Sequence, residues 1–471
     1  MRTSKIALSL ACIGMLVSCG GGSDAPPPIA GGGGGGGGNA SACSISERLA
    51  FTDAVFDEWY LFPNLLDTSL NRNNFNDVQD YIDALVRPAR EQSRDRFFSY
   101  ITSIEEENAF FNSGSSAGFG FRLIYDTTNR RVFIIETYDD TPALAGNIER
   151  GTEIVGVGTT AGNVVTTNSL LAQGGPQAFI NALGASDPGV TRVLDVIDQD
   201  GVRRDVTLTK AEFSLDPVPR YGAQIINDGG KQVGYVRLTS FINPAIGDLQ
   251  DAFADFRAAG VTEYVIDLRY NGGGGINVLE AFADLLGRGN EGQIFETIAF
   301  RPSKANLNET YRFQTDARSV APTKIAFITT SGSASASEAL VNGMVPYLGT
   351  DMAMVGQDTF GKPVGQSAFD LAECDDRLRV VTLQLENANG NGDYYTGLAD
   401  TVPVTCRAND DIFNDFGDPN EQMLATALDF LAGRSCTAIA GGPAGVQSVG
   451  RDLLAPERPT SVIEHEMPGV Y

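Results

Sequence analysis

The stretch of residues 324–366 constrains the fold more than any other part of the sequence. It begins with a short apolar run at 325–329 bounded by polar residues, which is typical of a buried strand. A turn of small residues follows at 330–337, and a helical pattern extends from about 338 to 347. A serine in such a strand-turn-helix unit presents its hydroxyl beside backbone N–H groups, where an acyl-transfer nucleophile and its oxyanion donors are expected. The other interpretation is a Ser/Ala-rich turn without chemistry.

The base that such a serine would need is constrained by the histidine content. The single histidine, His465, lies in the last seven residues, beyond any recognisable core, which argues against a Ser-His-Asp triad. Lysine is a known alternative base, and Lys362 follows a second apolar run at 352–355. Two strands of one sheet would bring the amine and the hydroxyl together. Because lysine acts as a base only when neutral, it must be desolvated, and the neighbouring Phe360 and Gly361 suit a buried turn.

The order of these residues resembles the catalytic signature of the carboxyl-terminal processing peptidases, or tail-specific proteases. The matching segments are residues 333–338, residues 359–362 and Gln366. The resemblance implies that Ser335 is the nucleophile, Lys362 the general base and Gln366 the residue that orients the lysine. It covers roughly residues 45–432, so it implies a serine endopeptidase built on the family's fold.

A polyglycine run follows another strand pattern, at residues 264–269. Consecutive glycines at 272–275 expose backbone N–H groups that can bind an anion, although a loose turn is the other interpretation. Residues 267–274 resemble the family's DLRxNxGG segment. The resemblance implies an oxyanion hole made by the N–H groups of Gly273 and Ala336, with one position of slack among the four glycines.

The hydrophobic period changes along the chain and divides it into parts. The pattern is helical at 43–112, changes to β at 113–212, and alternates between β and α from 213 to 436, as in a mixed sheet. Together with the resemblance, this predicts an α/β multidomain fold with an N-terminal helical segment, a PDZ-like β domain and a crotonase-like peptidase domain. Residues 437–471 are rich in Gly, Pro, Ala and Ser, which predicts a disordered tail.

The β-rich part carries a motif of its own, Gly118-Phe119-Gly120-Phe121. It resembles the carboxylate-binding loop of PDZ domains, and the segment from Thr141 to Ile154 resembles their next signature. Glycines leave N–H groups free to hold a terminal carboxylate, and the following strand edge pairs with the peptide. These four residues are therefore predicted to bind the C-terminus of a polypeptide. A PDZ-like domain that only supports the structure is the alternative.

The N-terminus has the pattern of an export signal. Arg2 and Lys5 precede an apolar segment at 6–17 that is too short to span a bilayer. Residues 16–19 resemble a bacterial lipobox, which makes residues 1–18 the signal peptide and Cys19 the lipidated residue. A flexible Gly-rich tether at 19–42 follows. The prediction is a membrane-anchored lipoprotein, placed by Gly20 at the outer membrane facing the periplasm. An ordinary signal peptide with a chance cysteine is the alternative.

Charge and cysteine content limit partners and cofactors. A formal net charge of −25 argues against nucleic acid as a partner. No Cys/His spacing indicates a metal, and no P-loop or dinucleotide fingerprint occurs, so neither metal nor cofactor is expected. Four cysteines remain after the tether, and they allow three connectivities. Because Cys374 and Cys406 flank a strand-turn-strand, that pair is predicted, leaving Cys43 and Cys436 to join the two ends of the fold.

Two functions follow from the sequence. The leading one is a lipid-anchored serine endopeptidase that acts, through a Ser-Lys acyl-enzyme, on polypeptides with accessible C-termini. The alternative is a non-catalytic protein that binds peptides or hydrophobic ligands on the same fold. The complete set of Ser335, Lys362 and Gln366 favours the enzyme, because a binding protein has no chemical need for it.

Overall fold

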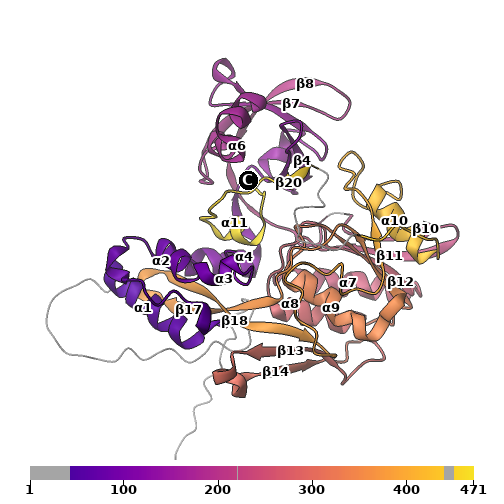
Figure 1. The fold of residues 1–471 in the computed structure, drawn as a ribbon. Helices are drawn as coiled ribbons and strands as arrows, with labels where there is room; N and C mark the ends of the chain where they lie inside the picture. The colour runs from indigo at the N-terminus through magenta and orange to yellow at the C-terminus, as the bar shows by residue number, and fades with distance from the viewer. Residues whose placement is uncertain (1–42, 220, 440–449) are drawn as a thin grey trace, which may run out of the picture.

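The computed structural model of the chain describes residues 43–219, 221–439 and 450–471. Cys19, the predicted signal peptide and the tether lie outside the described residues. Figure 1 shows a helical part in indigo, a β-rich domain above it, and a larger α/β domain beside both. The predicted α/β multidomain fold is thus confirmed.

The helical part begins at a capping box. The Ser44 side chain accepts a hydrogen bond from the Glu47 amide, and the Glu47 carboxylate accepts one from the Ser44 amide. Trp59 is buried, in a cluster that also contains apolar residues of two later strands. The helical part therefore shares its core with the α/β domain. Its elements are α1 (Ile45–Trp59), η1 (Pro63–Leu65), η2 (Arg72–Asn74), α2 (Val78–Leu85), α3 (Arg87–Glu91), β1 (Tyr100–Ser103) and α4 (Ile104–Ser113).

The β-rich domain is formed mainly by strands, in two sheets. Its main sheet runs β20-β3-β4-β5-β7-β8, with β6 paired to β5, and β2 pairs separately with β9. Helix α6 (Thr167–Leu183) is kinked at Gly174 and Gly175. The elements are β2 (Ser115–Gly118), β3 (Phe121–Asp126), β4 (Arg131–Thr137), α5 (Pro142–Ala145), β5 (Glu153–Gly158), η3 (Ala161–Asn163), β6 (Val165–Thr166), α6 (Thr167–Leu183), β7 (Thr191–Ile197), β8 (Arg203–Thr209) and β9 (Ala211–Ser214).

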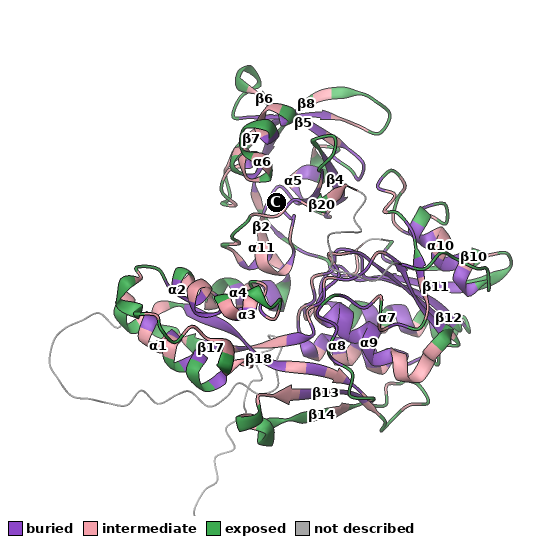
Figure 2. Cartoon of the chain, in the orientation of Figure 1, coloured by how far each residue is buried: buried purple, intermediate pink, exposed green. Residues whose placement is uncertain are grey.

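The α/β domain is built on a six-stranded sheet in the order β10-β11-β12-β15-β16-β19. Only β10 and β11 pair antiparallel, so the strands from β11 to β19 end at the same edge. Helices α7, α8 and α9 share one hydrophobic core with this sheet, and α10 packs in a second. Figure 2 shows the facing surfaces of this layer largely in purple, as buried.

A second sheet, β1-β18-β13-β14 with β17 paired to β18, joins this domain to the helical part. The elements of the α/β domain are β10 (Ala223–Asp228), β11 (Lys231–Arg237), α7 (Ala245–Ala258), β12 (Glu263–Asp267), α8 (Ile276–Leu286), β13 (Ile294–Phe300), η4 (Pro302–Leu307), β14 (Glu309–Arg312), β15 (Lys324–Thr329), α9 (Ala336–Leu348), η5 (Gly349–Asp351), β16 (Met352–Gly356), β17 (Val364–Leu371), η6 (Ala372–Cys374), β18 (Asp376–Asn387), β19 (Thr405–Arg407) and α10 (Gln422–Leu431).

The predicted disulfides are wrong. Cys43 pairs with Cys374, and Cys406 pairs with Cys436. The segment between Cys374 and Cys406 is not one hairpin, because β18 pairs with β17 and β13 while β19 belongs to the six-stranded sheet. Cys374 instead lies at the turn before β18, which meets the start of α1, so the first bond ties the helical part to that strand.

The prediction of a disordered tail is wrong for residues 450–471. This segment contains β20 (Arg451–Leu453), which pairs antiparallel with β3, and α11 (Val462–Glu466). Its composition cannot form a core of its own, yet six of its hydrophobic side chains are buried against the other parts of the protein. They are Leu454, Val462, Ile463, Met467, Val470 and Tyr471. Figure 1 shows α11, in yellow, between the β-rich domain and the helical part.

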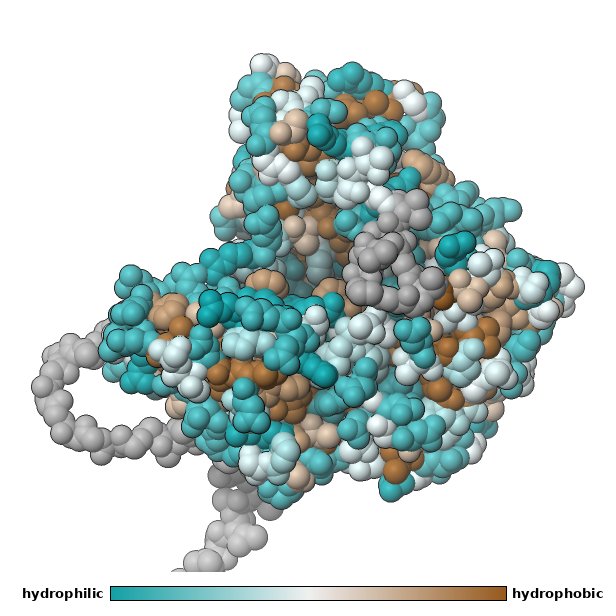
Figure 3. Space-filling model, viewed as in Figure 1, coloured by the Kyte–Doolittle hydropathy of each residue, from teal (hydrophilic) through white to brown (hydrophobic). Residues whose placement is uncertain are grey.

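The surface matches the acidic composition. Figure 3 shows that the face toward the viewer is mainly hydrophilic, with apolar residues scattered rather than gathered in one broad patch. The simplest interpretation of the net charge of −25 is that it keeps the protein dissolved.

Candidate active site

Ser335 lies at the turn between β15 and α9, where the sequence places the nucleophile. Its backbone has φ 55° and ψ −117°, a conformation that a residue with a side chain rarely adopts. Strain of this kind at a strand-to-helix turn is typical of an exposed catalytic serine. The side chain is half-buried and lines a small cavity.

Glu338 holds this turn in place. Its buried carboxylate accepts hydrogen bonds from the amides of Ser335 at 3.0 Å, Gly361 at 2.6 Å and Lys362 at 2.7 Å. Burial raises the pKa of Glu338 to about 7, although the hydrogen bonds that it accepts act in the opposite direction. Glu338 thus joins the serine turn to the lysine loop, a role that its place three residues after Ser335 could have suggested.

Lys362 reaches the same cavity from the loop after β16. Strands β15 and β16 are parallel, with Thr329 opposite Gly356, so their two following loops leave the sheet side by side. Lys362 Nζ donates to Gln366 Oε1 at 3.1 Å, and Gln366 Nε2 donates to the carbonyl oxygen of Phe98. Gln366 therefore fixes the direction of the lysine side chain.

The surroundings of Lys362 favour the neutral amine. Burial lowers its pKa, against the opposing charges of Glu466 and Asp95. The ring of Phe98 lies 5.0 Å from Nζ, and Arg96 donates to the carbonyl oxygens of Phe360 and Gly361. Phe98 and Arg96 belong to the segment between α3 and β1, which the sequence analysis assigned only to packing.

Ser335, Lys362 and Gln366 line one cavity, so the fold brings the three predicted residues together. Its volume is about 30 Å³, enough for one or two water molecules. Within the described residues, no hydrogen bond joins Ser335 Oγ to Lys362 Nζ. Contacts of this kind often tighten only when substrate binds.

The glycine loop after β12 lies against the serine turn. The Asn271 carbonyl oxygen accepts hydrogen bonds from the Ala334 amide at 3.0 Å and from Ser337 Oγ at 2.9 Å. Gly273 has φ +112°, and a Cβ there would lie 2.7 Å from Ser335 Cβ, so only glycine fits. The loop thus approaches the serine as closely as an oxyanion donor must.

The two predicted oxyanion donors, the amides of Ala336 and Gly273, differ in their surroundings. Ala336 lines the cavity at the first turn of α9. The Gly273 amide, however, donates to Oδ1 of Asn271 at 2.9 Å, so in this conformation it is already engaged. Of the loop's glycines, Gly274 lines the cavity. It is one position from Gly273, and the sequence alone did not decide between neighbouring glycines.

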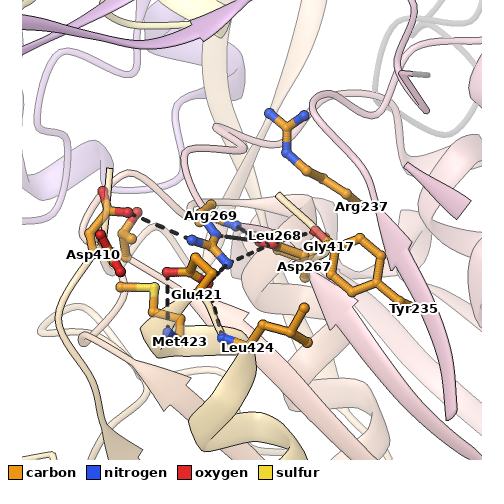
Figure 4. Close-up of polar contacts among 12 residues, drawn as sticks. Tyr235, Arg237, Asp267, Leu268, Arg269, Asp410, Gly417, Glu421, Met423 and Leu424 are labelled. Atoms are coloured by element: carbon orange, nitrogen blue, oxygen red, sulfur yellow. Dashed lines mark hydrogen bonds and ion pairs between the residues drawn. The ribbon is translucent and has the colours of Figure 1, made fainter. Parts of the chain in front are cut away.

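A buried ion-pair network anchors the glycine loop. Arg269 pairs with Asp267 at 2.9 Å and with Glu421 at 2.8 Å, and Asp410 lies 3.6 Å away. Figure 4 shows the Arg269 guanidinium between these carboxylates. Asp267 also accepts from the Tyr235 hydroxyl at 2.9 Å. These contacts therefore hold the end of β12, from which the glycine loop begins.

The predicted carboxylate-binding loop, Gly118–Phe121, lies in the β-rich domain between β2 and β3. The amides of Phe119, Gly120 and Phe121 converge on one acceptor, the main-chain oxygen of Tyr471. Three backbone N–H groups of the loop therefore point at one oxygen.

Two residues near the cavity were missed by the sequence analysis. Glu466 lines the cavity of Ser335, and His465 lines a neighbouring cavity with Lys362. The His465 ring stacks on Tyr100, with centroids 3.8 Å apart. Burial and the nearby Lys362 lower the pKa of His465 to about 3, so it is neutral. Nothing in the composition of the tail indicated that it returns to this site.

Known proteins resemble this chain in sequence and fold. Residues 232–404 match the model of peptidase family S41. The chloroplastic C-terminal processing peptidase of Tetradesmus obliquus is 28% identical over 276 residues, which cover 55% of this chain and 54% of the relative. The carboxy-terminal-processing protease of Bartonella bacilliformis is 27% identical over 301 residues, 62% of each chain. The chain thus spans roughly half the length of such relatives.

A solved structure shares the fold. A Bacteroides fragilis protein assigned as a candidate S41 protease superposes with a TM-score of 0.65 and 23% identity. The match covers 81% of this chain and 97% of that protein. It therefore extends beyond the α/β domain.

Proposed function

We propose that this chain, which contains a peptidase family S41 domain and is homologous to carboxyl-terminal-processing serine proteases, is itself a serine endopeptidase. Its substrates are polypeptides recognised through their C-terminal region. The observation that carries the proposal is the shared cavity of a strained Ser335 and a desolvated Lys362.

The reaction follows from these groups. Neutral Lys362 takes the proton of Ser335 Oγ as that oxygen attacks the scissile carbonyl carbon. The Ala336 amide and an amide of the glycine loop stabilise the oxyanion. Lys362 then gives its proton to the leaving amine, and the acyl-enzyme forms. Water, deprotonated by Lys362, attacks the ester carbon, the bond to Ser335 Oγ breaks, and Lys362 returns the proton to that oxygen as the acid product leaves.

Incubation with an unfolded protein substrate tests this function. The chain should fragment the substrate, and the Ser335→Ala variant should not. Ser331→Ala is the matched control, because Ser331 belongs to the same turn and has no role in the proposed reaction. Fragmentation by Ser335→Ala at the normal rate would exclude this serine. Binding of unfolded polypeptide without cleavage by any variant would favour the non-catalytic alternative.

We also propose attachment to a membrane through a lipid on Cys19. The lipobox pattern at residues 16–19 supports it. None of the helices in the described ranges is long and apolar enough to cross a bilayer.

The anchor is tested by changing the cysteine. Cys19→Ser should move the protein from the membrane fraction to the soluble fraction, because no acyl chain can then be attached. Its peptidase activity should be retained. Fractionation followed by immunoblotting measures the shift, with Cys12→Ser as the control. A wild-type chain found in the soluble fraction after export contradicts the anchor.

A further inference from the structure

The last three residues of the chain occupy the PDZ-like groove, defined here as the 118–121 loop and the edge of β3. The main-chain oxygen of Tyr471 accepts hydrogen bonds from the amides of Phe119 at 3.0 Å, Gly120 at 2.9 Å and Phe121 at 3.3 Å. The Tyr471 amide donates to the Phe121 carbonyl oxygen at 2.9 Å. The segment therefore lies as an added β-strand with its final residue in the glycine loop.

The pairing continues along the whole edge of β3. Val470 forms an antiparallel bridge with Arg122, and the Leu123 amide donates to the Gly469 carbonyl oxygen at 2.8 Å. Further along, β20 pairs with residues 124–126 in the same antiparallel sense. The tail thus uses every position at which a peptide strand would be added to β3.

The β-rich domain binds the side chain of Tyr471 as well as its backbone. It is buried in the core cluster that contains Phe119 and Phe121, and its hydroxyl donates to the Leu454 carbonyl oxygen at 2.7 Å. A Cβ on Gly118 would lie 2.5 Å from the Tyr471 carbonyl carbon, so the loop closes tightly on this residue. The pocket therefore fits an aromatic residue that carries a hydroxyl.

Before it reaches the groove, the tail crosses the catalytic cavity. Glu466, at the end of α11, lines the cavity of Ser335 and accepts a hydrogen bond from the Tyr100 hydroxyl at 2.9 Å. A Cβ on Gly272, beside the oxyanion loop, would lie 2.5 Å from the Glu466 carbonyl oxygen. The tail is thus packed directly on the loop that a substrate must reach.

The tail also forms one wall of a second cavity, of about 440 Å³, which is large enough for several residues of a peptide. Lys362 and Gln366 line this cavity too, and Leu453, His465 and Pro468 contribute from the tail. The same segment therefore fills the groove, lines the cavity of about 30 Å³ at Ser335 through Glu466, and bounds the adjoining cavity.

We propose that the tail is an intramolecular ligand of the PDZ-like groove that closes the active site. Substrates are then polypeptides with a hydroxylated aromatic residue directly after an apolar one such as valine, because these compete for the same contacts. This inference rests on the proposed peptidase function. Since the tail is tethered, its effective concentration is in the millimolar range, and weakly bound termini displace it only when abundant.

Peptide binding tests the ligand. A fluorescent peptide with the sequence of residues 467–471 and a free carboxylate is titrated against the Ser335→Ala chain, which cannot cleave it. A chain that ends at Pro468 should bind the peptide at least about 10-fold more tightly than the full chain, and an amidated peptide should bind at least about 10-fold more weakly. Equal affinity of the two chains, or no binding to either, overturns the proposal.

Two substitutions distinguish a specific effect on the groove from misfolding of the shortened chain. Tyr471→Asp keeps the chain length but places a charge in the apolar pocket, so it should release the tail and expose the groove to the peptide. Gly118→Ala in the shortened chain should abolish peptide binding, because its Cβ occupies the position of the terminal carbonyl carbon. Peptide binding that survives Gly118→Ala contradicts the assigned site.

Closure of the active site is measured without relying on proteolysis. A Ser335→Cys variant is treated with a bulky maleimide, and peptide mapping quantifies labelling at residue 335. The four described cysteines are paired and do not compete. Labelling should be at least about 10-fold faster without residues 469–471 or in Tyr471→Asp, and equal rates overturn the closure. If labelling and binding behave as expected while no variant cleaves polypeptides, the proposed peptidase function fails and this inference stands.

Discussion

Replacing Lys362 with alanine is expected to lower kcat/KM for an unfolded substrate by about 10³-fold or more, because Ser335 then has no base. Lys362→Arg should be equally inactive, since guanidinium keeps its proton at any working pH. Lys304→Ala, a change to an exposed ion pair with Glu58, is the control and should keep full activity. Steady-state kinetics checks all three, and normal activity in Lys362→Ala would exclude the lysine as base.

The pH dependence of the wild-type rate adds a second measurement. Burial lowers the pKa of Lys362, so the neutral amine is populated below the usual value of about 10.4. Activity requires the neutral form, and the rate should therefore rise with pH through a pKa below that value. It should fall as the pH drops and the amine becomes protonated. A rate that rises only above pH 10.4 would mean that the lysine is not desolvated.

The convergence of Ser335, Lys362 and Gln366 could be predicted from the sequence because local features determine it. Two apolar runs make neighbouring parallel strands, and the residues that follow such strands meet at one edge of the sheet. The four-residue spacing from Lys362 to Gln366 then lets the amide reach the amine. The family resemblance supplied the roles, and the geometry is consistent with them.

The features that the sequence did not reveal depend on contacts between distant segments. Cys43 and Cys374 are 331 residues apart, and only the packing of α1 beside the turn before β18 explains their bond. The Phe98 carbonyl that holds Gln366 has no side-chain chemistry to mark it. Most of the large apolar residues of the tail are buried, and they pack in clusters that include residues of the other parts of the protein. The composition of such a segment indicates whether it can fold alone. This segment is ordered because it packs on other parts of the protein.

The ion-pair network around Arg269 also combines a part that the sequence indicates with a part that depends on a distant segment. The resemblance points to residues 267–269, but Glu421, at the start of α10, lies 152 residues away in sequence. Both carboxylates and the guanidinium are buried, and Figure 4 shows the contacts that join them. Opposite charges withdrawn from water must be paired, so each member depends on the others.

Replacing Arg269 with methionine is therefore expected to destabilise the α/β domain by about 3–5 kcal/mol, because it leaves Asp267 and Glu421 buried without a counter-charge. Urea denaturation followed by far-UV circular dichroism measures the loss. Tryptophan fluorescence is unsuitable, since Trp59 is the only tryptophan and lies in the helical part.

Arg318→Met is the matched control for this loss. It breaks a partly exposed arginine–aspartate pair, with Asp316 at 2.7 Å, and should cost no more than about 1 kcal/mol. Adding Glu421→Gln to Arg269→Met should cost less than the sum of the two single changes, because one unpaired charge is removed at the same time. A loss near that of the control would mean that water or a local rearrangement solvates the carboxylates. In that case the network would not be what holds the glycine loop against Ser335.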